Sequence, residues 1–146
     1  MSTTEFGRID EQWIRDGRAT RLPDALSQEF DAYLNRLPWL GSTLDWSKMP
    51  PSRSFDVAGK KRYELRSWTA ETKIGTHTHV AIWYSRVGGG LVVPLGFAIA
   101  NLDALYRHTP GIRFAFGVDF IEGQMQPMYG DLLQYGNGDE LVAVVE

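Results

Sequence analysis

The apolar positions of the first third of the chain recur at helical spacing. Between residues 23 and 37 they are three or four apart, which places them on one side of a helix: Leu26, Phe30, Tyr33, Leu34 and Leu37. Pro23 suits the first helical position, where its missing N–H breaks no hydrogen bond. Pro38 cannot continue a helix. We therefore expect a helix over residues 23–37.

Beyond residue 50 apolar and polar residues alternate, which is typical of half-buried strands. The pattern predicts strands at 54–58, 61–70, 77–87, 91–99, 112–120 and 141–145. Glycine-rich segments at 88–90 and 136–138 predict the turns of hairpins, because glycine adopts positive φ without strain. Pro94 predicts an edge position or a bulge within its strand. Asn101 can cap a short helix over residues 102–108.

One main helix followed by a series of hairpins predicts an α+β fold. We expect an antiparallel sheet of about five to six strands, with the N-terminal helix packed on one face and the short helix near residues 102–108. Residues 1–146 are sufficient for a single globular domain with its own core. Residues 1–20 are mostly polar, with one or two weak helical turns, so we expect them to be loosely ordered.

The composition indicates a protein that folds without covalent cross-links. The chain has no cysteine, which excludes disulfides, a thiolate nucleophile and a Cys-based zinc site. Its N-terminus lacks the basic and apolar regions of a secretory signal. The longest apolar stretch, 91–100, is too short to span a bilayer. We therefore expect a cytoplasmic protein that does not bind membranes.

Charge is distributed unevenly along the chain. The total is −3, yet from residue 101 onward seven acidic residues oppose only Arg107 and Arg113. These acidic residues are Asp103, Asp119, Glu122, Asp131, Asp139, Glu140 and Glu146. Between residues 48 and 73 the sign reverses, since seven lysines and arginines oppose three acidic residues. Separated charges of this kind indicate partners and association rates, not a particular fold.

His77 and His79 form the one pair of residues with metal-ligand character. Two residues apart on a strand, their rings would share one face. A third ligand from His108, Glu71 or Asp119 would complete a metal site. This pair is the basis of the alternative hypothesis, a small metal-dependent enzyme. The plain alternative is a partly exposed pair at the start of a strand.

Other catalytic and binding motifs are weak or absent. No Gly-x-Ser-x-Gly nucleophile motif occurs, and the glycines at 88–90 are not followed by the lysine of a phosphate-binding loop. Asp119 and Glu122 are close enough in sequence to act as paired carboxylates, but acids at a strand end are commonly just solvated. The basic segment 60–68 is interrupted by Glu64, so we do not expect nucleic-acid binding.

Five tryptophans are many for a chain of this length. Most are expected in the core, because large rings dominate burial there. Trp39 and Trp46 lie in the segment after the predicted helix, near Asp45. Loop tryptophans of this kind commonly anchor protein interfaces. The two positions are therefore candidate partner contacts as well as candidate core residues.

Taken together, these features resemble the immunity proteins that neutralise bacterial polymorphic and contact-dependent inhibition toxins. The features are a cysteine-free domain, Trp39-Leu40-Gly41 with Trp46 around a loop, and an acidic segment from residue 103 to 146. The resemblance implies a stoichiometric inhibitor, without cofactor or catalysis, that occludes the active site of one cognate toxin domain.

A basic nuclease domain would be the natural partner, because nucleases bind phosphate backbones. Acidic side chains would then steer association, and apolar anchors would supply affinity. The candidate contacts are Asp119, Glu122, Asp131, Asp139, Glu140, Trp39 and Trp46. A self-associating domain with residues 91–99 as its edge strand is a third hypothesis.

Overall fold

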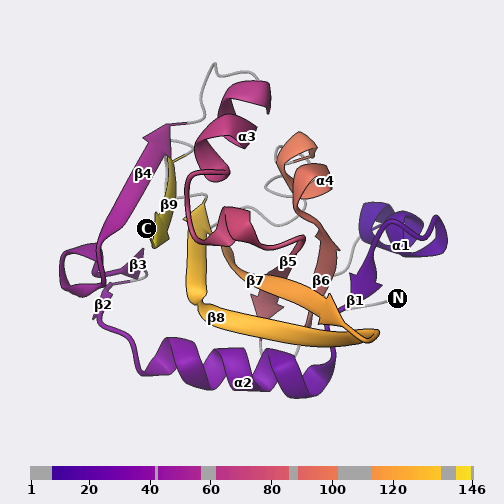
Figure 1. Cartoon of the computed structure of the whole chain (residues 1–146). Coiled ribbons are helices and arrows are strands. Elements are labelled where there is room, and N and C mark those ends of the chain that lie inside the picture. Colours follow the sequence, from indigo (N-terminus) through magenta and orange to yellow (C-terminus); the bar gives the residue numbers. More distant parts are fainter. Residues whose placement is uncertain are drawn as a thin grey trace.

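The computed structural model describes residues 8–41, 43–56, 62–85, 89–101, 113–135 and 141–145. Within these ranges the chain forms one seven-stranded antiparallel sheet, a separate two-stranded hairpin and four α-helices (Figure 1). The α+β prediction is therefore confirmed, with a sheet slightly wider than expected. None of the helices in the described ranges has the length and apolar character needed to cross a membrane.

The large sheet has the strand order β1-β6-β5-β7-β8-β9-β4. Its strands are β1 (Thr20–Arg21), β4 (Ser52–Asp56), β5 (His79–Ser85), β6 (Gly89–Pro94), β7 (Arg113–Ile121), β8 (Gln124–Tyr135) and β9 (Leu141–Val145). The small hairpin consists of β2 (Trp39–Leu40) and β3 (Thr43–Leu44). Every described pairing is antiparallel, which suits short hairpin connections.

Helices cover both faces of the large sheet. They are α1 (Arg8–Arg15), α2 (Asp24–Asn35), α3 (Arg62–Thr69) and α4 (Leu95–Ala100). Two short 3₁₀ turns also occur, η1 (Trp46–Lys48) before β4 and η2 (Ile74–Thr76) before β5. Helix α2 runs along one face, and α3 and α4 lie on the opposite side (Figure 1). The predicted helix at 102–108 and the predicted turn at 136–138 lie outside the described residues.

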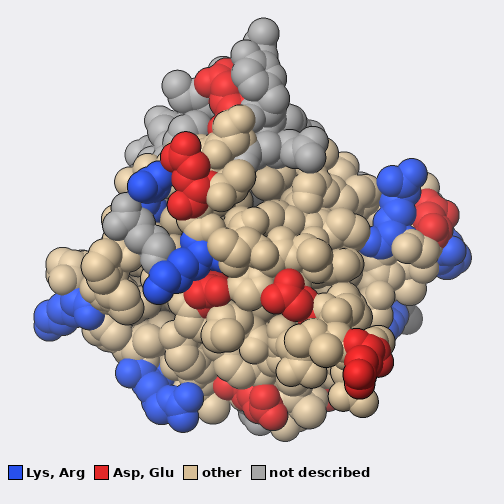
Figure 2. All heavy atoms as spheres, in the orientation of Figure 1, with Lys and Arg blue, Asp and Glu red and all other residues tan. Residues whose placement is uncertain are grey.

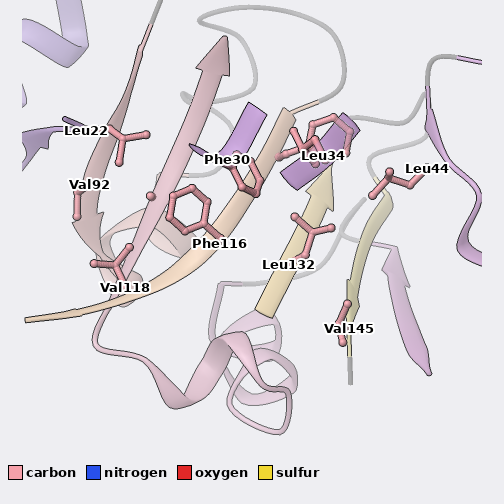
Figure 3. Close-up of a cluster of buried hydrophobic side chains, with 11 residues drawn as sticks. Leu22, Phe30, Leu34, Leu44, Val92, Phe116, Val118, Leu132 and Val145 are labelled. Carbon is pink, nitrogen blue, oxygen red and sulfur yellow. The ribbon is translucent and has the colours of Figure 1, made fainter. Parts of the chain in front are cut away.

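The core on the α2 face follows directly from the predicted helical stripe. Phe30 and Leu34 of α2 are buried, and the Phe30 ring lies 4.4 Å from that of Phe116 on β7 (Figure 3). The predicted alternation of β7 is confirmed for Phe114, Phe116 and Val118, which all belong to this cluster. Fully burying a large apolar side chain contributes about 1.5–3 kcal/mol, so this layer is a major source of stability.

A second core lies on the opposite face. Val80 and Ile82 of β5 pack there with Ile74 of η2, and the Trp13 and Phe97 rings meet edge to face at 4.9 Å. Burial on both faces explains why β5 and β6 read as nearly continuous apolar runs.

Residues 62–69 form helix α3, so the predicted strand at 61–70 is wrong. Trp68 packs against the second core, and its neighbour Thr69 is also buried. Adjacent residues can both face inward at the edge of a helical stripe, whereas in a strand they point to opposite sides. Tertiary packing thus overrides the local alternation.

The predicted strand at 91–99 is wrong in its second half. β6 ends at Pro94, and α4 begins at Leu95, whose N–H donates to the Thr78 carbonyl. Pro94 has φ −58° and ψ 141°, an extended conformation that leads into the helix. Pro94 pairs with His79 of β5 and lies beyond the pairing of β6 with β1, so it occupies an edge position, one of the two expected places, and not a bulge.

β8 is the longest strand, and the sequence did not predict it. Gly117 pairs with Met128 while the adjacent Phe116 pairs with Leu132, so residues 129–131 form a bulge. The strand bends sharply there (Figure 1). Bulges break the period-two pattern, which hides such a strand from sequence analysis.

Pro127 lies within β8 at a position where proline does not interrupt the sheet. β9 pairs only with residues 133–135, which leaves that edge of β8 without a described strand neighbour, so the missing N–H of Pro127 breaks no strand pairing.

Candidate functional site

The ring of His77 lies between two carboxylates. Its Nδ1 is 2.8 Å from Oδ2 of Asp119 on β7, and its Nε2 is 2.6 Å from Oδ2 of Asp131 in the β8 bulge. The His77 side chain is only 8% exposed. Asp119 also accepts a hydrogen bond from the backbone N–H of Thr78. We call these three residues the His77 cluster.

A glycine makes room for this ring. A Cβ placed on Gly117 would lie 2.1 Å from Cδ2 of His77, far inside van der Waals contact. The imidazole therefore rests directly on the backbone of β7. Gly117 pairs with Val80, a residue of the second core, so His77 lies on the sheet face covered by α3 and α4.

His79 lies on the other face of the sheet. It pairs with Val118, which packs in the α2 core, and its ring meets the Phe120 ring at 4.7 Å. The expectation that both imidazoles share one face is therefore wrong. The physical reason is that β5 begins only at His79, whereas His77 ends η2 and is free of the strand's alternation.

The hydrogen bonds of the His77 cluster indicate a charged imidazole. An ionised carboxylate only accepts, so two such partners need two ring N–H donors, as in an imidazolium. Burial lowers the pKa of His77, but the hydrogen bonds to Asp131 and Asp119 and their negative charges more than offset this, and the pKa is raised overall. The hydrogen bond from His77 lowers the pKa of Asp119.

The hydrogen bonds of the two histidines occupy three of their ring nitrogens. Both ring nitrogens of His77 are directed at carboxylates. Nδ1 of His79 is 2.8 Å from the Thr78 hydroxyl. In the described parts of the chain, no group of three or more His, Asp or Glu residues is placed to hold a metal ion. His108 lies outside those parts.

The acidic residues predicted to contact a partner lie in three different surroundings. Asp119 and Asp131 meet through His77, whereas Glu122 is exposed in the turn between β7 and β8. Asp139 and Glu140 lie outside the described residues. On the face shown in Figure 2, acidic side chains are spread among uncharged ones and do not form a single patch.

The two candidate tryptophans differ in their contacts. Trp39 is 38% exposed, although its indole N–H donates to the Leu34 carbonyl and its ring meets Phe114. The indole N–H of Trp46 donates to Oε1 of Gln134 at 3.3 Å. Gln134 is buried and also accepts from the backbone N–H of Leu44, so it attaches the β2–β3 hairpin to β8.

Exposed apolar side chains at the β7–β8 tip, which we define as residues 119–128, were missed by sequence analysis. Phe120, Ile121 and Met128 are 38%, 59% and 51% exposed. Glu122 and Gly123 have φ of 53° and 80°, the positive values of a two-residue type I′ turn. A Glu-Gly pair between apolar segments was the available signal for this hairpin.

No protein-family model matches the chain, and no curated protein is significantly similar to it.

Proposed function

We propose that this protein is a stoichiometric protein-binding module of the immunity type. It binds a cognate toxin domain with a basic surface and occludes that domain's active site. The observation that carries this proposal is the β7–β8 tip, where exposed apolar side chains lie beside acidic ones. Ile121, the most exposed of them at 59%, directly precedes the acidic turn residue Glu122.

The charge of this region supports a basic partner. Residues 114–135 contain three acidic residues and no lysine or arginine. Complementary charge raises the rate of association, while buried apolar anchors supply most of the affinity. Toxin nucleases bind phosphate backbones and are commonly basic, so they fit this description.

The His77 cluster supports a role without turnover. The most buried ionisable side chain of the cluster holds its surroundings together through both ring nitrogens. An inhibitor needs a rigid, preformed surface more than a reactive group, because ordering a mobile surface on binding lowers the affinity.

Calorimetric titration against basic toxin nuclease domains, made inactive by substitution of a catalytic residue, tests the proposal. We expect one-to-one binding to a cognate domain, and about tenfold or greater weakening between about 50 mM and about 500 mM salt. Acidic toxin domains of similar size serve as the control. Absence of binding to every basic domain at low salt would contradict the proposal. So would equal binding to the acidic controls.

A further inference from the structure

We infer that the β7–β8 tip is the docking surface of this protein, and that it fits a partner surface where lysines or arginines surround an apolar recess. The inference rests on the proposed function and assigns it to one place in the fold.

The tip extends beyond the strand that supports it. β5 begins at His79, which pairs with Val118 of β7. Asp119 and the residues that follow it on β7 therefore have no strand partner on the β5 side within the described pairings. They are held by β8 on the other side, as far as the pair Ile121 and Gln124. A projecting hairpin of this kind can enter a recess on a partner.

Register places the apolar and acidic side chains of the tip on the same face. Residues directly opposite each other in an antiparallel pair point to the same side. Asp119 pairs with Gln126, Ile121 with Gln124, and Gly117 with Met128. Ile121, Asp119 and Met128 therefore share the face of the His77 cluster, with two exposed glutamines beside them. Phe120 points to the α2 side, together with its partner Met125.

The charge of the tip indicates which class of partner can bind there. The tip contains Asp119 and Glu122 and no lysine or arginine. Asp119 is paired with His77, so the negative charge that the tip presents to a partner is chiefly that of the exposed Glu122. A second copy of this chain would bring acidic tips together, and a nucleic acid would bring phosphates against carboxylates. Both contacts are repulsive. A cationic protein surface is attracted, and its apolar recess covers Ile121 and Met128.

Among the described residues, the β2–β3 hairpin is the other place with large exposed apolar side chains, and it fits a cationic partner less well. Trp39 is already engaged by Leu34 and Phe114, and Leu40 is the more exposed apolar side chain of this hairpin. Residues 39–44 contain no acidic residue that corresponds to Glu122. The nearby Asp45 lies 3.9 Å from Lys48 and accepts hydrogen bonds from Ser47, so its charge is partly compensated, as that of Asp119 is by His77.

The tip is also preorganised at its base. His77 holds Asp119 and Asp131 from one face of the sheet. On the other face, Tyr129 of the same bulge donates to Glu29 of α2 and packs its ring against Phe116. A surface fixed from both sides loses little conformational entropy on binding, which favours tight association.

The first experiment uses the free protein. Relaxation of backbone amides is measured with a cationic and with a neutral nitroxide added as soluble probes. We expect the ratio of the two effects to be at least about twofold higher at residues 119–126 than at residues 39–44. An equal ratio at the two hairpins would overturn the inference without testing the proposed function.

The second experiment uses the inactive basic nuclease domain that binds most tightly in the titrations above. Glu122→Lys and Ile121→Ser are each expected to weaken binding by about tenfold or more. The matched variants Glu11→Lys and Leu40→Ser change an exposed residue of the same type elsewhere, and we expect about twofold effects or less. Circular dichroism and thermal unfolding confirm that all four variants fold.

The outcomes separate the two proposals. If the complex forms but the tip variants bind as tightly as the wild type, the docking surface is wrong and the proposed function stands. Larger losses with Leu40→Ser than with Ile121→Ser would assign docking to the β2–β3 hairpin and likewise overturn the inference. If no basic domain binds, the proposed function fails and the cationic partner inferred here fails with it, whatever the nitroxide ratio.

Discussion

The two hairpins with exposed apolar side chains are attached to the body of the protein in different ways. The β7–β8 hairpin is held by His77, which is hydrogen-bonded to carboxylates on both strands. The β2–β3 hairpin is held by Gln134, whose amide oxygen accepts from Leu44 and Trp46. Both attachments use β8 but lie on opposite faces of the sheet: Asp131 is in the bulge, and Gln134 follows shortly after it. One attachment is ionic and the other is neutral.

This difference predicts that the stability of the β7–β8 attachment depends on pH and that the stability of the β2–β3 attachment does not. A neutral amide keeps its hydrogen bonds at any moderate pH, whereas the His77 cluster depends on one bound proton. Removing His77 from this partly buried cluster also costs more than removing a neutral acceptor, because the mostly buried carboxylate of Asp131 is then left without compensation. The variants below test this difference, from the largest expected effect to the smallest.

His77→Leu is expected to destabilise the protein by about 3 kcal/mol, because Asp119 and Asp131 then face each other without the positive charge between them. Urea unfolding followed by tryptophan fluorescence measures the loss. His79→Leu is the matched control, expected to change stability by less than about 1 kcal/mol, since His79 has no carboxylate partner among its described hydrogen bonds. Equal effects of the two variants would contradict the ionic attachment.

Gly117→Ala should destabilise by about 2 kcal/mol, since the added methyl group overlaps the His77 ring and displaces it from its partners. Gly130→Ala is the control in the neighbouring bulge, where the nearest atom to the new Cβ is the Tyr33 hydroxyl oxygen at 3.6 Å, an ordinary contact. Thermal unfolding of both variants decides the matter. A stable Gly117→Ala protein would mean that His77 does not rest on this strand.

Gln134→Met keeps the volume of the side chain and removes its acceptor. The buried N–H of Leu44 then lacks this partner, and we expect a loss of about 1.5 kcal/mol. Because the amide does not titrate, the loss should be the same at about pH 5 and about pH 8. Urea unfolding at the two values checks this. A loss that changes with pH would contradict the neutral character of this attachment.

The smallest effect is the pH dependence of the wild-type protein. The raised pKa of His77 gives stabilisation that is complete below the usual value of 6.5 and is lost as pH rises through the folded-state pKa. The lowered pKa of Asp119 gives stabilisation that is complete above the usual 3.8 and is lost as pH falls through its folded-state pKa. Stability from the cluster is therefore greatest between these values.

Subtracting the stability of His77→Leu from that of the wild type at each pH isolates this contribution. We expect the difference to shrink as the solution is made alkaline above about pH 6.5. The ionisable groups placed around the ring are Asp119 of β7 and Asp131 of β8. Asp119 also interacts electrostatically with His79, and Asp131 with Tyr33 of α2. Lys73, just before η2, is exposed. A difference that grows with pH would contradict the assignment.

The fold was largely predictable where one period dominates. The helical stripe of α2 buries one face, and the alternation of β7 places its large apolar side chains on the α2 side and the small Ala115 on the other. Both patterns were predicted from spacing alone. α3 and β8 were not. In α3, packing of Trp68 and Thr69 outweighs an apparent alternation, and in β8 the bulge at residues 129–131 interrupts the period.

The site was predictable only in part. Sequence analysis selected His77, Asp119 and Asp131, but it named His77 only as a metal ligand in the alternative hypothesis and the two acids chiefly as partner contacts. Their meeting depends on three features that spacing does not show: the start of β5 at His79, the bulge in β8, and the space left by Gly117. Long-range contacts of this kind appear only after the strands are paired.

The most direct test of the central claim is NMR of the His77 ring nitrogens in isotopically labelled protein. The claim is that this side chain is an imidazolium held by two carboxylates at the base of the β7–β8 hairpin. We predict that near pH 6.5 both ring nitrogens of His77 are protonated. One unprotonated nitrogen at that pH, or a shift of either nitrogen on addition of zinc, would contradict it.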